Sequence, residues 1–117
     1  MKLIARKLTS TEIDEIIQVK INWILTASTP VKVILFGSAA SGEMTEESDI
    51  DLIIIFNNDV DLKEVSYQLA KNRPKNDWPQ DLILQTRQSF EWSVAKGGGA
   101  CWLADREGKI LFERETK

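Results

Sequence analysis

Two strongly apolar segments lie on either side of a polar stretch, and this arrangement limits the folds open to the chain. The segments are VKVILF, residues 31–36, and LIIIF, residues 52–56. Each is a continuous apolar run of strand length, which is typical of strands that are covered on both faces. We therefore expect two central strands of a sheet that is packed on both sides.

Gly37-Ser38 follows the first run directly, and after ten further residues comes Asp49-Ile50-Asp51. The second strand is predicted over residues 49–56. Because side chains alternate between the two faces of a strand, Asp49 and Asp51 are expected to point the same way. Two such charges repel by roughly 4 kcal/mol at 4 Å if the effective dielectric constant is near 20. A divalent metal ion is the natural occupant of the space between them.

The remaining elements alternate helix with strand and predict an α/β layer structure. Thr9 and Glu12 form a capping-box pattern that opens a helix, which should end before Pro30. Residues 100–113 allow two interpretations, a short helix over 100–107 followed by a strand over 110–112, or a hairpin of 100–104 with 109–113; we favour the helix. Further elements are predicted at residues 31–36 (strand), 38–42 (helical turn), 61–71 (helix), 81–86 (strand) and 87–96 (helix).

Composition excludes several classes of function. The 117 residues, 43% hydrophobic and 28% charged, predict one domain over residues 1–117. The chain has no His and one Cys, so a Ser-His-Asp triad, a Cys/His zinc site and an internal disulfide are all excluded. A net charge of −3 argues against direct nucleic-acid binding. Without a membrane span or signal peptide in this sequence, a cytoplasmic location is expected.

Two other groups of residues are interpreted mainly as structural. The basic cluster Lys71-Arg73-Lys75 is expected to be solvated surface, with a contribution to phosphate binding as the alternative. The four tryptophans are expected to be core or interface anchors rather than platforms for a nucleobase. They are Trp23, Trp78, Trp92 and Trp102.

The pattern Gly37-Ser38, ten residues, Asp49-x-Asp51 resembles the signature of the nucleotidyltransferase superfamily that includes DNA polymerase β and kanamycin nucleotidyltransferase. The chain is most similar to minimal nucleotidyltransferases, the antitoxins of prokaryotic two-gene modules whose partner is a helical HEPN-domain protein. The resemblance implies a polymerase β palm-like fold. Such a fold has a mixed sheet of three core strands and a short C-terminal strand, flanked by helices.

The resemblance also implies roles for five residues. Asp49 and Asp51 would be catalytic and would bind two Mg²⁺ ions, which prefer oxygen ligands. Asp81, the single acidic residue of the third apolar run, would supply the later-strand carboxylate as a metal ligand or proton acceptor; a capping or plain surface role is the alternative. Gly37 and Ser38 would hold the phosphates of the nucleotide, unless they form an ordinary turn.

The function implied is transfer of a nucleoside monophosphate, AMP from ATP, to a hydroxyl acceptor. In the family's two-gene modules this acceptor is a tyrosine of the HEPN partner, and the nucleotidyltransferase acts as antitoxin. The chain has little room for an acceptor-binding domain, so another chain is expected to supply that site. The alternatives are a non-catalytic module that binds nucleotide or partner, and an enzyme that modifies a small antibiotic. The nucleotide base, the oligomeric state and the physiological metal stay open.

Overall fold

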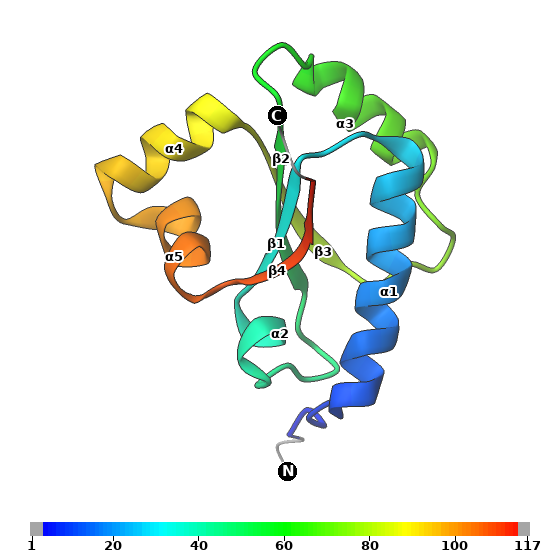
Figure 1. Ribbon diagram of the computed structural model, residues 1–117. Coiled ribbons are helices and arrows are strands. Elements are labelled where there is room, and N and C mark those ends of the chain that lie inside the picture. The colour runs from blue at the N-terminus through cyan, green and yellow to red at the C-terminus, as the bar shows by residue number, and fades with distance from the viewer. Residues whose placement is uncertain (1–3, 115–117) are drawn as a thin grey trace.

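The computed structural model describes residues 4–114, in which one four-stranded sheet is covered by helices on both sides (Figure 1). Helices α1 and α3 lie on one face of the sheet, and α4 and α5 lie on the other. The short helix α2 lies at the end of the sheet. In chain order the elements are α1 (Ser10–Ala27), β1 (Lys32–Phe36), α2 (Ser38–Ser41), β2 (Ile50–Phe56), α3 (Leu62–Lys71), β3 (Gln80–Thr86), α4 (Arg87–Lys96), α5 (Gly99–Glu107) and β4 (Lys109–Glu113).

The sheet is mixed, with the strand order β3-β2-β1-β4. Strand β1 pairs antiparallel with both β2 and β4, whereas β2 and β3 pair parallel. Helix α3 forms the crossover that a parallel pair requires. The predicted mixed sheet of three core strands plus a short C-terminal strand is confirmed.

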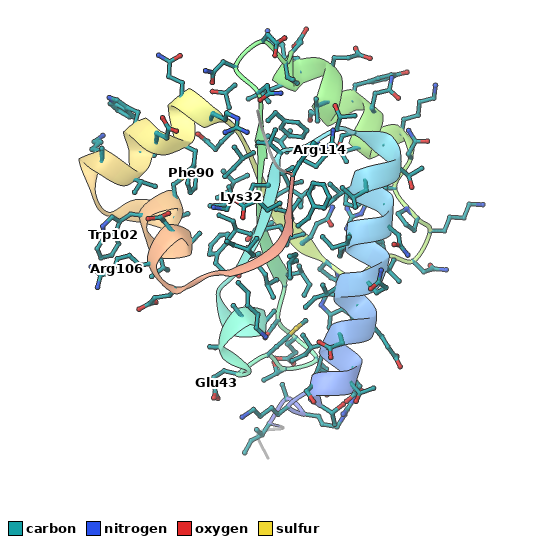
Figure 2. All side chains as sticks on the ribbon, in the orientation of Figure 1. Lys32, Glu43, Phe90, Trp102, Arg106 and Arg114 are labelled. Carbon is teal, nitrogen blue, oxygen red and sulfur yellow. The ribbon has the colours of Figure 1, made fainter. Side chains whose placement is uncertain are left out.

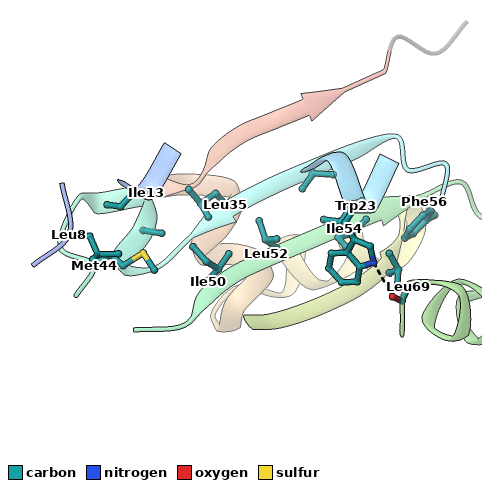
Figure 3. Close-up of a cluster of buried hydrophobic side chains, with 13 residues drawn as sticks. Leu8, Ile13, Trp23, Leu35, Met44, Ile50, Leu52, Ile54, Phe56 and Leu69 are labelled. Atoms are coloured by element: carbon teal, nitrogen blue, oxygen red, sulfur yellow. Dashed lines mark hydrogen bonds between the residues drawn. The ribbon is translucent and has the colours of Figure 1, made fainter. Parts of the chain in front are cut away.

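Strand β2 is buried on both faces, which explains its continuous apolar sequence. Its side chains alternate between two separate core layers. Leu52, Ile54 and Phe56 pack with residues of α1 and α3, including Trp23 and Leu69 (Figure 3). The layer on the opposite face contains Ile53 and Ile55 with Ile34, Phe90, Cys101 and Ala104. Phe90 points from α4 toward the sheet in Figure 2. Each fully buried Leu, Ile or Phe contributes about 1.5–3 kcal/mol through removal from water.

The observed elements depart from the sequence-based expectations in a few places. The hairpin alternative for residues 100–113 is wrong, because α5 spans Gly99–Glu107 and only β4 follows it. Strand β2 begins at Ile50, so Asp49 lies just before the strand rather than within it. Trp92, expected to be a core or interface anchor, does not lie in the core: it is 64% exposed, with the Lys96 ammonium 5.1 Å from the centre of its ring. The capping box of Thr9 and Glu12 at the start of α1 is confirmed.

A buried ion pair joins α1 to the segment that leads into β3. Lys20 Nζ lies 2.6 Å from Asp77 Oδ2, and the two side chains are 1% and 4% exposed. Burial lowers the pKa of Lys20, although its contacts with Asp77 oppose this effect. The ammonium also donates to Gln80 Oε1 at 2.7 Å and to the carbonyl of Trp78. All three of its protons therefore have acceptors.

None of the helices within residues 4–114 is both long and apolar enough to cross a membrane.

We predict that Lys20→Met lowers the free energy of unfolding by about 3 kcal/mol. Loss of one member of a buried pair leaves the other charge poorly compensated, and Arg73 Nε, 3.0 Å from Asp77 Oδ2, keeps the cost near the lower end of the usual range. Lys32→Met is the matched control, because Lys32 pairs with Glu113 at the surface. It should cost less than about 1 kcal/mol. Urea denaturation of both variants checks the difference.

The difference in free energy of unfolding between wild type and Lys20→Met should become smaller in acid. Burial raises the pKa of Asp77, but bonds from Lys20 and Arg73 outweigh it and hold the pKa below its ordinary value. A carboxyl group with a lowered folded-state pKa contributes stability that is present above its unfolded-state pKa. That stability is lost as the pH falls through the folded-state pKa. A gap that stayed constant from neutral pH to well below pH 4 would contradict this explanation.

Candidate active site

Strands β1, β2 and β3 each start or stop at the same end of the sheet, which brings the sequence-predicted residues into one region. Strand β1 ends there at Phe36, and β2 and β3 begin there. Because β1 and β2 are antiparallel, Phe36 is the partner of Asp51; because β2 and β3 are parallel, Asp51 is in turn the partner of Asp81. Partners in a ladder project to the same face. The side chains of Asp51 and Asp81 therefore lie next to each other.

These two aspartates lie on the face of the sheet that α4 and α5 cover. Asp51 shares its face of the strand with Ile53 and Ile55, which belong to the core layer on that side, and Asp81 shares its face in the same way with Ile83. Asp51 is half-buried, whereas Asp49 and Asp81 are exposed. The aspartates thus lie at the end of these rows of apolar side chains, where the face of the sheet reaches the solvent.

Burial raises the pKa of Asp51, and the neighbouring Asp81 and Asp49 raise it further through their charges. The charges of Asp81 and Asp49 both act on Asp51, so the three carboxylates lie within electrostatic reach of one another. A cation would relieve this repulsion.

Gly37 packs its backbone directly against the carboxylate of Asp51. A Cβ atom at this position would lie 2.3 Å from Asp51 Oδ2, where no atom fits. The residue also adopts φ 73° and ψ −153°, a conformation that is essentially restricted to glycine. Glycine is therefore required here both by backbone geometry and by the approach to Asp51. An ordinary turn would account for the first requirement but not for the second.

Helix α2 begins at Ser38, as predicted, and has only four residues. Its first turn is closed by bonds from the amides of Ala40 and Ser41 to the carbonyl of Gly37. Ser38 is half-buried and follows the residue that touches Asp51. Phosphate binding by Gly37 and Ser38 stays a prediction.

The donor set suits Mg²⁺, which is held in proteins by one or two carboxylates together with waters and substrate phosphates. The Asp51 carboxylate, whose pKa its neighbours raise, lies beside a backbone with no Cβ, and together with Asp81 it provides oxygen ligands with space around them. Within residues 4–114, no three His, Cys, Asp or Glu side chains form a cluster that could hold an ion unaided. The site would therefore depend on the phosphates of the nucleotide for further ligands.

Two features lie on the opposite side of the sheet. Arg73, from the basic cluster considered for phosphate binding, donates to Asp77 and to the carbonyl of Trp78 instead. A hollow of about 570 Å³ lies between α1 and the loop before β3, with Ile16, Val19 and Trp78 in its lining. None of the three aspartates lines this hollow, so we do not place the reaction there.

Comparison with known proteins identifies the family. A family model described as "Nucleotidyltransferase domain" matches residues 13–114. The chain belongs to this nucleotidyltransferase family. The resemblance stated from Gly37-Ser38 and Asp49-x-Asp51 is thereby confirmed, and the protein is a nucleotidyltransferase enzyme.

A relative and a solved structure agree with this assignment. A protein of Methanocaldococcus jannaschii, named "Putative protein adenylyltransferase", is 60% identical over an 85-residue alignment that covers 69% of this chain and 77% of that protein. The crystal structure of a "putative nucleotidyltransferase" from Sulfolobus solfataricus superposes with a TM-score of 0.59. It covers 90% of this chain and 84% of its own, at 15% identity, and so shows the shared nucleotidyltransferase fold.

We predict that Asp51→Asn stabilises the metal-free protein. The substitution removes the half-buried charge that faces Asp81, and a like-charge pair at directly opposed positions costs up to about 1 kcal/mol. Thermal unfolding in excess EDTA should show a higher midpoint for this variant than for wild type. With Mg²⁺ and ATP added, wild type should gain stability and the variant should not. A lower midpoint for Asp51→Asn in EDTA would show that Asp51 is structural.

We predict that Gly37→Ala reduces nucleotidyl transfer by about 100-fold, because the new methyl group must displace the Asp51 carboxylate. Gly98→Ala is the matched control. Gly98 has a similar backbone conformation, φ 76° and ψ 166°, but a Cβ there would have nothing within 4 Å. Both variants should lose about 1–3 kcal/mol of stability. Only Gly37→Ala should lose activity, and equal activity losses would remove the special role of Gly37.

Proposed function

We propose that this nucleotidyltransferase transfers AMP from ATP to a hydroxyl group of a protein, with Mg²⁺ bound by Asp49, Asp51 and Asp81. The proposal treats residues 1–117 as one minimal nucleotidyltransferase domain. The observation that supports it best is the register of β2 with β3, which sets Asp51 beside Asp81 at the edge where Gly37 touches the Asp51 carboxylate.

The reaction requires an acceptor oxygen to bond to the α-phosphorus of ATP while the bond from that phosphorus to the bridging oxygen breaks and pyrophosphate leaves. Bound Mg²⁺ ions would supply charge stabilisation for the attacking and leaving oxygens. Asp49 and Asp51 would hold the nucleotide-side cation. Asp81, which is exposed, would accept the proton of the attacking hydroxyl or hold the second cation.

Gly37 and Ser38 would orient the triphosphate. The absent side chain of Gly37 lets the phosphates approach the backbone at the same point where the backbone meets Asp51. Ser38 adds a hydroxyl donor at the first position of α2.

A protein acceptor is favoured over a small molecule. The relative from M. jannaschii carries the name protein adenylyltransferase and is 60% identical over the matched region. The minimal nucleotidyltransferases that this chain resembles modify a tyrosine on a HEPN-domain partner and thereby act as antitoxins. We propose the same acceptor and the same role here.

The test is a labelling experiment with ATP carrying ³²P at the α-phosphate, Mg²⁺ and, as the acceptor, a HEPN-domain protein from the same organism. We expect label on a partner tyrosine with α-labelled ATP and none with γ-labelled ATP. The double variant Asp49→Asn with Asp51→Asn should lose at least about 1,000-fold of this activity, since electrostatic stabilisation of the transition state is lost. EDTA should have the same effect.

A specific outcome would favour a non-catalytic binding module instead. If the double variant still neutralised the partner and wild type left no label on it, association alone would be the function. Label on the partner that persists in the double variant would place the chemistry elsewhere in the chain.

A further inference from the structure

The segment of residues 77–80, which leads directly into Asp81, is held on one side by α1. Lys20 Nζ donates to Asp77 Oδ2 at 2.6 Å, to Gln80 Oε1 at 2.7 Å and to the carbonyl of Trp78. Gln80 and Asp81 are consecutive in β3, so their side chains lie on opposite faces. Lys20 therefore fixes the start of β3 from the face opposite to the aspartates.

The same segment is also bonded to the residues around Asp49. The indole Nε1 of Trp78 donates to the carbonyl of Ser48 at 2.8 Å. The amide of Ile50 donates to the carbonyl of Pro79 at 2.9 Å. Ser48 and Ile50 are the two neighbours of Asp49 in the chain. The peptide groups on both sides of Asp49 are thus tied to residues 78 and 79.

These two bonds matter because Asp49 lies outside the ladder that positions Asp51 and Asp81. Strand β2 begins at Ile50, so the register of β2 with β3 does not include Asp49. The turn before it is closed locally by the amide of Ser48 donating to Thr45. The indole bond of Trp78 is a side-chain contact that connects this turn to β3.

We propose that Trp78 is a positioning residue for the metal-binding aspartates: its indole N–H, on a segment clamped by Lys20, sets the distance between Asp49 and Asp81. This inference rests on the proposed function. Groups that orient metal ligands from outside the coordination sphere typically alter metal affinity by about 10- to 100-fold when they are removed. Trp78 would act in this way without touching the metal, the nucleotide or the acceptor.

The chain contains a matched control for the Trp78 bond. Trp23 Nε1 donates to the carbonyl of Leu69 at 3.0 Å, which is the same kind of bond between an indole and a backbone carbonyl (Figure 3). Trp23 is only 5% exposed, and its bond joins α1 to α3 away from the aspartates. Trp23→Phe and Trp78→Phe therefore remove equivalent bonds, and a purely structural effect should be at least as large for Trp23→Phe.

The experiment measures Mn²⁺ binding by the electron paramagnetic resonance of free Mn²⁺, with the non-transferable analogue α,β-methylene-ATP present at saturation. We expect Trp78→Phe to bind Mn²⁺ about tenfold more weakly than wild type, and Trp23→Phe to differ from wild type by less than about twofold. Hydrogen exchange without metal or nucleotide gives a second readout. The amide of Ile50 should exchange faster in Trp78→Phe and unchanged in Trp23→Phe.

Wild-type affinity in Trp78→Phe, or equal losses in the two variants, would overturn the positioning role. Unchanged exchange at Ile50 in Trp78→Phe would also count against it. Failure of the proposed function has a different signature. In that case wild type and the Asp49→Asn, Asp51→Asn double variant would bind Mn²⁺ equally, and the positioning role would fall with it.

Discussion

Repulsion between neighbouring carboxylates is the interaction on which the rest of this site depends. The backbone hydrogen bonds between β2 and β3 fix Asp51 and Asp81 side by side. The ladder that holds them continues along β2, which is buried on both faces. The apolar side chains of β2 thus stabilise an arrangement that is itself unfavourable at one end. The folding energy of the strand thus holds together carboxylates that would otherwise repel each other apart.

The two faces of the sheet have separate tasks. The face toward α4 and α5 carries the rows that end in Asp51 and Asp81, whereas the face toward α1 and α3 contains the larger core layer and the buried Lys20. Contacts on the second face reach the first through the strands and through the segments that lead into them. Because of this division, the buried ammonium of Lys20 can hold the start of β3 in place without putting a positive charge beside the aspartates.

Much of this could be predicted from the sequence, since the relevant signals are local. Continuous apolar runs identify β1 and β2, cap residues such as Thr9 and Asp61 mark the helix starts, and the motif around Gly37 and Asp49 carries the family resemblance. Strand direction is not local: the resemblance implied that the sheet is mixed, but the parallel pairing of β2 with β3 was not predicted. Lys20 escapes detection for a related reason. Its place three residues after Ile17 and four before Ile24 puts it within the apolar stripe of α1, but its partners are 57–60 residues away. The exposure of Trp92 follows from the helical period: Phe90 and Val94 face the core, and Trp92, two residues from each, lies on the opposite side of α4.

The crossover from β2 through α3 to β3 also has a consequence for the newly made chain. Parallel strands cannot pair as a hairpin, so Asp51 meets Asp81 only after the whole connection has closed, which is a slow kind of contact to form. During synthesis, Gly37, Asp49 and Asp51 leave the ribosome well before Asp81 and the residues that fasten it to α1. Asp51 and Asp81 are consequently brought together only after the connection through α3 has been translated.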